Sequence, residues 1–338
     1  MHGSPPSREL IRMLLQGTAA PRPLVLPIVF ALGARIENVS LGAYLGNPTK
    51  IVNAMRQLRG PLGVDGLTCY CDPFLEVEAL GATVHWSDND TQSRITWPGR
   101  PPPGEVAEGL FPPEEAVRRG RIPVAVDVVR RLKTLVRDEV LLTACLSGPF
   151  TLAARIGQLD TTNAFGVEQL RGAAMELASE VVTQLSSVLA EAGANVLFLR
   201  EQMLPNFTPE TAEAWSLCLE PAVNIARFYE AVPALVLSTR SPREYARHAL
   251  RELTNIVTCV EPAVWSSLEP EILSNVDVRS AGVAVPTEML TESGPSVAGD
   301  AASGMWPRKV IATTPDDVPP ESDARALADA LRRYAVQG

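Results

Sequence analysis

Short apolar runs alternate with longer amphipathic stretches along most of this chain. The apolar runs are bounded by glycine, proline or polar residues, as buried strands are, and the longer stretches repeat their apolar residues at helical spacing. The predicted strands are residues 24–30, 66–71, 140–146, 195–199, 234–237, 256–260, 276–285 and 309–312. The predicted helices are residues 49–59, 124–137, 165–192, 209–229, 242–253 and 322–334.

This alternation predicts an α/β fold, and about eight strands in one chain favour a TIM (β/α)8 barrel over a doubly wound sheet. A doubly wound sheet usually has a glycine-rich nucleotide turn after its first strand, and residues 31–35 form neither G-x-G-x-x-G nor a P-loop. We expect residues 1–20 to be an N-terminal tail and helix, and residues 21–338 to be one barrel domain. Residues 83–97 read as a β-hairpin and residues 98–104 as a proline-rich loop, so 83–120 are a predicted excursion after the second strand.

The composition narrows the class of protein. The chain is 46% hydrophobic and 20% charged with a formal net charge of −9, which argues against nucleic-acid or anionic-membrane partners. No apolar stretch approaches the length of a membrane span, and the N-terminus lacks a signal-peptide pattern. The five cysteines are dispersed and odd in number. These features predict a cytoplasmic protein.

Arginines recur just after the predicted strands, where a TIM barrel places its active site. They are Arg35, Arg155, Arg200 and Arg240, after the first, third, fourth and fifth strands. Converging guanidinium groups would bind a small anionic substrate that carries carboxylate or phosphate groups. The alternative for each arginine is a local ion pair with Asp or Glu. Thr151, Glu201 and Ser238 accompany these arginines at the same strand ends.

Asp72 directly follows the second predicted strand and precedes a proline. A carboxylate in that place needs a partner or a cavity, so it is a candidate catalytic group, and the alternative is a helix N-cap. The three histidines, His2, His85 and His248, do not stand at zinc spacing with each other or with cysteine pairs. We therefore predict no metal ligands and no cofactor.

Three segments together resemble signature regions of the uroporphyrinogen decarboxylase superfamily, which includes methylcobamide:thiol methyltransferases. They are SGPFTLAARI at 147–156, CDPFLEVEALGA at 71–82 and TPDDVPPESDARALADAL at 314–331. The resemblance covers most of the chain from about Arg8 to Tyr334 and implies a TIM barrel. It also implies a homodimer, the state that the family often adopts.

The resemblance implies two chemistries. Zinc-dependent methyltransferases carry a His-x-Cys pair after the fifth strand and a later cysteine, where this chain has Ser238, Arg240 and Asp316. Metal-free decarboxylases use an aspartate against the pyrrole nitrogens, arginines for carboxylates, and a tyrosine and a histidine. Asp72 and Arg35 lie close to the places of the aspartate and of one arginine, while Arg155 and Asp316 stand where the tyrosine and the histidine would be.

The leading hypothesis is metal-free decarboxylation, or related lyase chemistry, of an anionic carboxylate-bearing substrate, with a tetrapyrrole as one candidate. In it Asp72 stabilises the protonated intermediate, and Asp316 donates a proton if burial raises its pKa. Arg35, Arg155 and Arg240 bind carboxylates, and Arg200 and Glu201 position the substrate or neutralise each other. One alternative is methyl transfer with a thiol and a corrinoid protein partner, with an altered metal site. Another is a non-catalytic binder of a tetrapyrrole or other anion.

Overall fold

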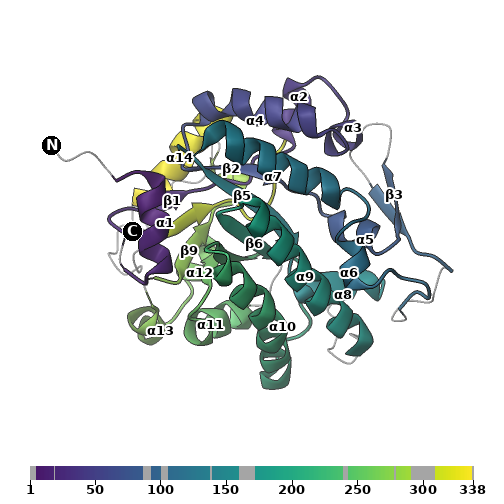
Figure 1. Ribbon diagram of the computed structural model, residues 1–338. Helices are drawn as coiled ribbons and strands as arrows, with labels where there is room; N and C mark the ends of the chain where they lie inside the picture. Colours follow the sequence, from purple (N-terminus) through teal and green to yellow (C-terminus); the bar gives the residue numbers. More distant parts are fainter. Residues whose placement is uncertain are drawn as a thin grey trace.

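Eight parallel strands form a nearly closed barrel with helices around it, which confirms the predicted TIM-barrel class (Figure 1). The strands follow one another in the order β1-β10-β9-β8-β7-β6-β5-β2. The structure is a computed structural model, and it describes residues 5–18, 20–86, 93–99, 106–137, 139–159, 172–238, 243–277, 279–290 and 309–336.

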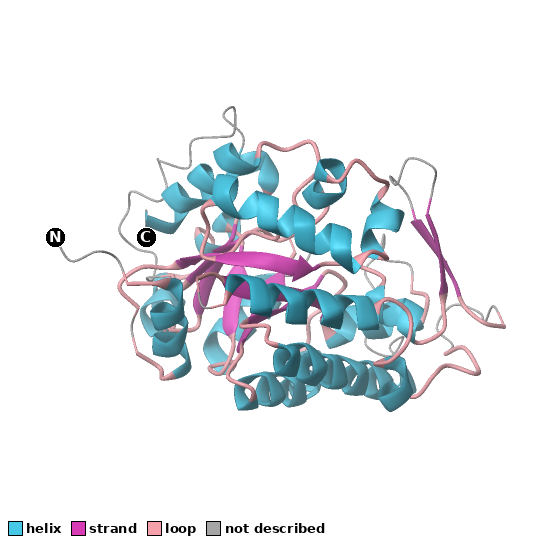
Figure 2. Ribbon diagram, turned by 45° about the horizontal axis from the view of Figure 1, so that its top comes forward, coloured by secondary structure: helices cyan, strands magenta, loops and turns pink. Residues whose placement is uncertain are grey.

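The strands of the barrel are short and buried. They are β1 (Leu24–Val25), β2 (Gly66–Tyr70), β5 (Leu141–Ser147), β6 (Val196–Glu201), β7 (Val232–Leu237), β8 (Val257–Val260), β9 (Ala281–Ala284) and β10 (Ile311–Thr313). The predicted hairpin is β3 (Thr83–Trp86) paired antiparallel with β4 (Ser93–Thr96), and its turn lies outside the described residues. Figures 1 and 2 both show this hairpin standing away from the barrel strands.

Helices cover the outside of the barrel and connect its strands (Figure 2). The longer ones are α1 (Ser7–Leu15), α4 (Pro48–Leu62), α7 (Ile122–Val136), α8 (Pro149–Ile156), α9 (Gly172–Ala192), α10 (Pro209–Phe228), α11 (Arg243–Glu252) and α14 (Ala324–Val336). The shorter ones are α2 (Leu32–Ile36), α3 (Leu41–Leu45), α5 (Leu75–Ala79), α6 (Pro113–Ala116), α12 (Pro262–Trp265), α13 (Pro270–Asn275) and the 3-10 turn η2 (Thr287–Leu290). No described helix is long and apolar enough to cross a membrane.

The barrel closes between β1 and β2 through side chains. The strand predicted over residues 24–30 is only two residues long, because the Ile28 N–H donates to Thr314 Oγ1 instead of continuing the ladder with β10, and Pro27 has no N–H to give toward β2. Asp65 supplies hydrogen bonds between the two segments. Its N–H donates to the Val25 carbonyl at 3.1 Å, and its carboxylate accepts from Val25 N at 2.8 Å. Thr68 Oγ1 donates to the Pro27 carbonyl at 3.2 Å.

Other predicted elements have different bounds in the structure. The predicted strand over 276–285 is β9 alone, because residues 270–275 are the helix α13 and residue 276 ends it. The long predicted helix over 165–192 is α9 from Gly172, and its first residues lie outside the described chain. The predicted N-terminal helix is α1, whose Leu10 and Leu14 are buried in the same apolar core as the barrel strands.

The turn from β5 into α8 depends on a buried carboxylate of the next strand. Glu201, at the end of β6, accepts hydrogen bonds from Phe150 N at 3.1 Å and Thr151 N at 2.8 Å, which are free donors in the first turn of α8. Pro149 occupies the start of the helix, where its missing N–H costs nothing. A Cβ on Gly148 would lie 2.2 Å from Glu201 Cδ. Glycine is required here because the carboxylate approaches the backbone so closely.

We expect Gly148→Ala to destabilise the protein by about 1–3 kcal/mol, because the added methyl group must displace Glu201 from the start of α8. Gly46→Ala is the matched control, since nothing lies within 4 Å of the Cβ added there, and its effect should stay within about 0.5 kcal/mol. Urea unfolding of both variants measures the difference. Equal unfolding midpoints would show that Glu201 does not constrain this turn.

Candidate active site

A chain of polar contacts joins the carboxyl ends of β2, β5, β6 and β10. We call it the carboxyl-end cluster, and its members are Glu76, Ser147, Arg155, Arg200, Gln202 and Asp316. Ser147 N and Oγ donate to Glu76 at 2.7 and 3.1 Å, and Arg155 Nη1 donates to Ser147 Oγ at 2.7 Å. Arg155 Nη2 donates to Gln202 Oε1 at 2.9 Å, and Gln202 Nε2 donates to Asp316 Oδ1 at 2.8 Å. The cluster therefore spans segments that lie far apart in the sequence.

Arg155 binds protein groups and not a neighbouring carboxylate. Besides Ser147 and Gln202, its Nη1 donates to the Pro73 carbonyl at 2.6 Å. Burial lowers the pKa of Arg155, and the negative charge of Glu76 opposes that effect. A guanidinium still stays charged at neutral pH. Its described contacts make Arg155 a brace between the β2, β5 and β6 loops, and they orient the amide of Gln202.

Arg200 pairs with Asp316 across the barrel, at 2.5 Å from Nη2 to Oδ1. Arg200 and Glu201 therefore do not neutralise each other, because successive residues of a strand point to opposite faces. The hypothesis of Asp316 as a proton donor required this side chain to be buried, and the structure exposes it. Its side chain is 60% exposed while that of Arg200 is 9% exposed. The carboxyl group beside it, Asp317, accepts from Phe30 N and Ala31 N, and burial raises its pKa to about 7.

Glu201 and Thr151 lie outside the barrel interior, between β6 and the helices. Glu201 Oε1 also accepts from Trp215 Nε1 of α10 at 2.9 Å, and burial raises its pKa. Thr151 Oγ1 donates to Glu201 at 2.5 Å and accepts from Gln202 N and Met203 N. These contacts use the full bonding capacity of the hydroxyl. Both residues position the loop after β6. Their described contacts are all with groups of the protein.

Asp72 is held by Arg121, which follows the predicted excursion at the start of α7. Its side chain is fully buried, and Oδ2 accepts from Arg121 Nε at 2.9 Å with Nη2 at 2.8 Å. Oδ1 accepts from Phe74 N at 2.9 Å, so the carboxylate forms an Asx-type turn, and α5 begins only at Leu75. Burial raises the pKa of Asp72, against the opposing charge of Arg121. Both oxygens are occupied, which makes Asp72 an anchor for Arg121 at the start of α7.

Two buried polar atoms at the ends of β7 and β8 have no hydrogen-bond partner within the described chain. They are Ser238 Oγ and Glu261 Oε1. The register pairs Val236 with Cys259, and continuing it by two residues sets Ser238 beside Glu261 on the face of Arg200. Glu261 is 7% exposed, and burial, followed by the charges of Asp316 and Glu288, raises its pKa to about 7. Such atoms mark a place for a ligand or water.

The two remaining predicted arginines do not join the cluster in the described structure. Arg35 is exposed in the last turn of α2, and its Nη2 donates to the Ser322 carbonyl at 3.5 Å. Arg240 lies outside the described residues, as does Thr239. Of the four predicted arginines, the described structure therefore brings together Arg155 and Arg200.

Sequence reasoning missed Glu261, Gln202, Glu76 and Arg121. Glu261 carries the same signal as Asp72, a carboxylate and then a proline directly after an apolar run, at the end of the predicted strand 256–260. Glu76 and Gln202 carry no such signal, because their partners lie 71 and 114 positions away in the sequence. Only the folded chain identifies them.

The donors at the positions implied by a methyltransferase zinc site do not suit that metal ion. Ser238 supplies a hydroxyl, and Asp316 Oδ1 is already bound by Arg200 and Gln202. Thiol-activating zinc is held by cysteine and histidine. Among the described residues, no group of three or more His, Cys, Asp or Glu is arranged to hold a metal ion.

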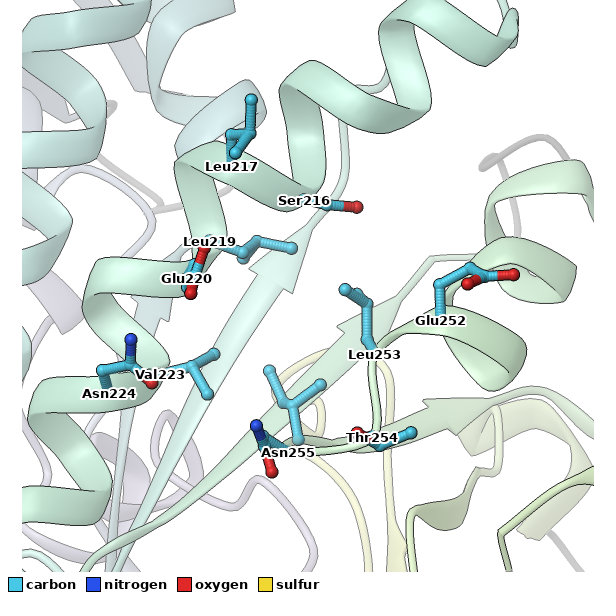
Figure 3. Close-up of a pocket in the computed structure, with 11 residues that line it drawn as sticks. Ser216, Leu217, Leu219, Glu220, Val223, Asn224, Glu252, Leu253, Thr254 and Asn255 are labelled. Carbon is cyan, nitrogen blue, oxygen red and sulfur yellow. The ribbon is translucent and has the colours of Figure 1, made fainter.

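A separate groove of about 270 Å³ lies between α10 and α11 (Figure 3). Leu217, Leu219 and Leu253 give it an apolar lining, and Glu220 and Glu252 add carboxylates. Ser216 at its edge lies 2.8 Å from His248 Nε2. The groove contains none of the residues selected from the sequence and belongs to the outer helical layer.

Asp72→Asn should destabilise the protein by about 1–3 kcal/mol, because it removes the buried counter-charge of Arg121 and leaves that guanidinium only with Glu78, 3.3 Å away. Asp127→Asn is the matched control: Asp127 pairs with Arg131 on the exposed face of α7, where such a pair contributes about 0.3–0.5 kcal/mol. Chemical unfolding of both variants measures the loss of stability. Removing a structural anchor lowers stability, whereas removing a substrate-facing carboxylate does not. A fully stable Asp72→Asn protein would contradict the anchoring role.

Glu261→Gln should change how stability depends on pH. The folded-state pKa of Glu261 is raised to about 7 from 4.5, so the folded protein binds the proton more tightly than the unfolded chain. Wild-type stability should therefore fall relative to the variant as pH rises from about 4.5 to 7, by roughly 1–2 kcal/mol after solvent screening, and then stay level. Urea unfolding from pH 4 to 8.5 measures this, with the half-exposed Glu269→Gln as control. Parallel curves would contradict the buried, unpaired state of Glu261.

The model of the uroporphyrinogen decarboxylase (URO-D) family matches residues 6–235. Two methylcobamide:CoM methyltransferases MtaA from Methanosarcina barkeri are similar in sequence. One, from strain Fusaro / DSM 804, is 24% identical over 146 residues, which cover 42% of each chain. The other is 23% identical over 134 residues, covering 39% of this chain and 38% of that protein. The aligned part thus spans less than half the length of these relatives.

Solved structures share the fold over nearly the whole chain. A methyltransferase from Methanosarcina mazei has a TM-score of 0.73 at 16% identity, covering 97% of this chain and 99% of its own. A B12-independent methionine synthase from Shewanella sp. W3-18-1 has a TM-score of 0.57 at 15% identity, covering 93% and 94%. The family match spans more than half of the sequence, from α1 through β7. This chain therefore belongs to the uroporphyrinogen decarboxylase family.

Proposed function

We propose that this protein is an enzyme that decarboxylates a small carboxylate-bearing substrate at the carboxyl end of its barrel. Family membership supports an enzyme. The observation that carries the proposal is Glu261, a buried carboxyl group with an unpartnered oxygen; the register of β7 and β8, extended by two residues, sets the unpartnered hydroxyl of Ser238 next to it. Its pKa of about 7 lets it hold a proton at neutral pH and give it up.

The roles follow from the charges around Glu261. Arg200 is a buried cation that reaches the same side of the barrel and would anchor a carboxylate of the substrate. When the bond between the substrate carbon and its leaving carboxylate breaks, CO2 departs and the electron pair stays on the carbon. Glu261 donates its proton to that carbon and is then reprotonated from water. Arg155 orients the amide of Gln202, which offers an N–H donor, and Asp72 holds Arg121 at the start of α7.

Release of CO2 from a panel of carboxylate compounds, including porphyrinogens, tests this proposal. On any compound that the wild type turns over, Glu261→Gln should lower kcat by about 100-fold or more, the usual contribution of a general acid. Glu269→Gln, an exposed carboxylate paired with Arg247, is the control and should leave turnover unchanged. Normal turnover by Glu261→Gln would overturn the assignment of the acid.

Methyl transfer is the second candidate, and it rests on the two methylcobamide:CoM methyltransferases that resemble part of this chain. It would bring a corrinoid protein as partner and zinc as cofactor. The described donors at Ser238 and Asp316 do not match a Cys and His ligand set, which is why we place this candidate second. Elemental analysis of the purified protein for zinc, with an assay of methyl transfer from a methylcobamide to a thiol, separates the two functions. Stoichiometric zinc with methyl transfer would favour the second.

A further inference from the structure

The Arg200–Asp316 pair joins a buried cation to an exposed carboxylate. The Arg200 side chain is 9% exposed, and its other described partners are neutral: the Pro315 carbonyl, 3.3 Å from Nε, and Cys71 Sγ, 3.6 Å from Nη1. Asp316 is 60% exposed and lies on the solvent side of the guanidinium. Asp316 is thus the described carboxylate in contact with this cation, and it sits where a ligand arriving from solvent would first meet Arg200.

Asp316 is held less firmly than the other carboxylates at this end of the barrel. Asp72, Glu76, Glu201 and Asp317 each accept at least one backbone N–H. The Asp316 carboxylate accepts only from the side chains of Arg200 and Gln202, and both donate to Oδ1. Its second oxygen has no described hydrogen bond. Nothing but side-chain contacts would have to break for Asp316 to turn away.

Gln202 presents a donor that does not depend on Asp316. Its Oε1 accepts from Arg155 Nη2 at 2.9 Å, and Arg155 is itself fixed by Pro73 and Ser147. The amide is therefore oriented with its NH2 group toward Asp316 and Arg200. If Asp316 left, a guanidinium and an oriented amide would both face the vacated place. Together they suit a planar carboxylate, which can accept one hydrogen bond on each oxygen.

We propose that Asp316 is a resident stand-in for a substrate carboxylate, which displaces it from Arg200 and Gln202 on binding. This inference rests on the proposed function, because it names the anion site of that reaction. The exchange replaces one carboxylate by another, so the negative charge near Glu261 is kept and Glu261 retains its proton. A neutral ligand would leave Arg200 without the counter-charge that contacts it, with only the more distant Asp317 acting on it, which is unfavourable. We therefore expect this site to bind anionic ligands in preference to neutral ones, because only an anion replaces the charge of Asp316.

Binding of succinate, followed by calorimetry at pH 7, tests the exchange. Removing the internal competitor should tighten binding, so Asp316→Asn should bind succinate about tenfold more tightly than wild type. Asp277→Asn is the matched control, because Asp277 also pairs with an arginine, Arg279, but outside the cluster. It should bind as the wild type does. Arg200→Gln should lose succinate binding, and Gln202→Leu should weaken it, which keeps the test valid if the Arg200 variant does not fold.

Two results would overturn the inference. One is that Asp316→Asn binds succinate no more tightly than Asp277→Asn does. The other is that neither of these two variants binds succinate. Turnover distinguishes this failure from failure of the proposed function. If Glu261→Gln abolishes CO2 release while Asp316→Asn binds no better, only the exchange is wrong. If Asp316→Asn tightens binding but Glu261→Gln turns over normally, the anion site stands and the proposed acid does not.

Discussion

Buried carboxylates that accept hydrogen bonds from backbone N–H groups organise the carboxyl end of this barrel. Glu201 binds the first turn of α8, Asp317 binds the residues before α2, and Asp72 binds the turn before α5. A buried carboxylate without donors would cost several kcal/mol, and a helix start has free donors to offer. The ends of β2, β6 and β10 are therefore each tied to a helix start, and these hydrogen bonds fix the positions of the loops that follow.

Two carboxylates at this end of the barrel accept no backbone N–H group in the described structure. Glu261 is buried with an oxygen that accepts nothing in the described structure, and Asp316 is exposed with only side-chain donors. The first is suited to hold a proton, because burial and neighbouring negative charge disfavour its ionised form. The second is suited to move. A carboxylate that neither ties a loop nor packs against one is free for a role in chemistry, and both exceptions lie on the side of the barrel that Arg200 reaches.

The sequence predicted the barrel well because strand and helix signals are local. The apolar run 140–146 is β5 within one residue, whereas the predicted strand at 24–30 is too long, because Ile28 N bonds to the Thr314 side chain instead of to β10. The site was harder to predict. Arg155 and Arg200 are visible as arginines after strands, but their partners Pro73, Gln202 and Asp316 come from other loops. Whether an arginine binds a loop or a ligand depends on those tertiary neighbours, which periodicity does not encode.

The same Arg200–Asp316 contact bears on the choice between the two chemistries of the family. A divalent cation on either oxygen of Asp316 would lie within a few ångströms of the Arg200 guanidinium, which already contacts Oδ1 at 2.5 Å, and two positive charges that close repel each other. A carboxylate ligand meets the opposite situation, because Arg200 and Gln202 already offer it donors. Methyl transfer by zinc would thus require the buried arginine to withdraw first. Anion binding requires only that the exposed aspartate gives way, which is the smaller rearrangement of this structure.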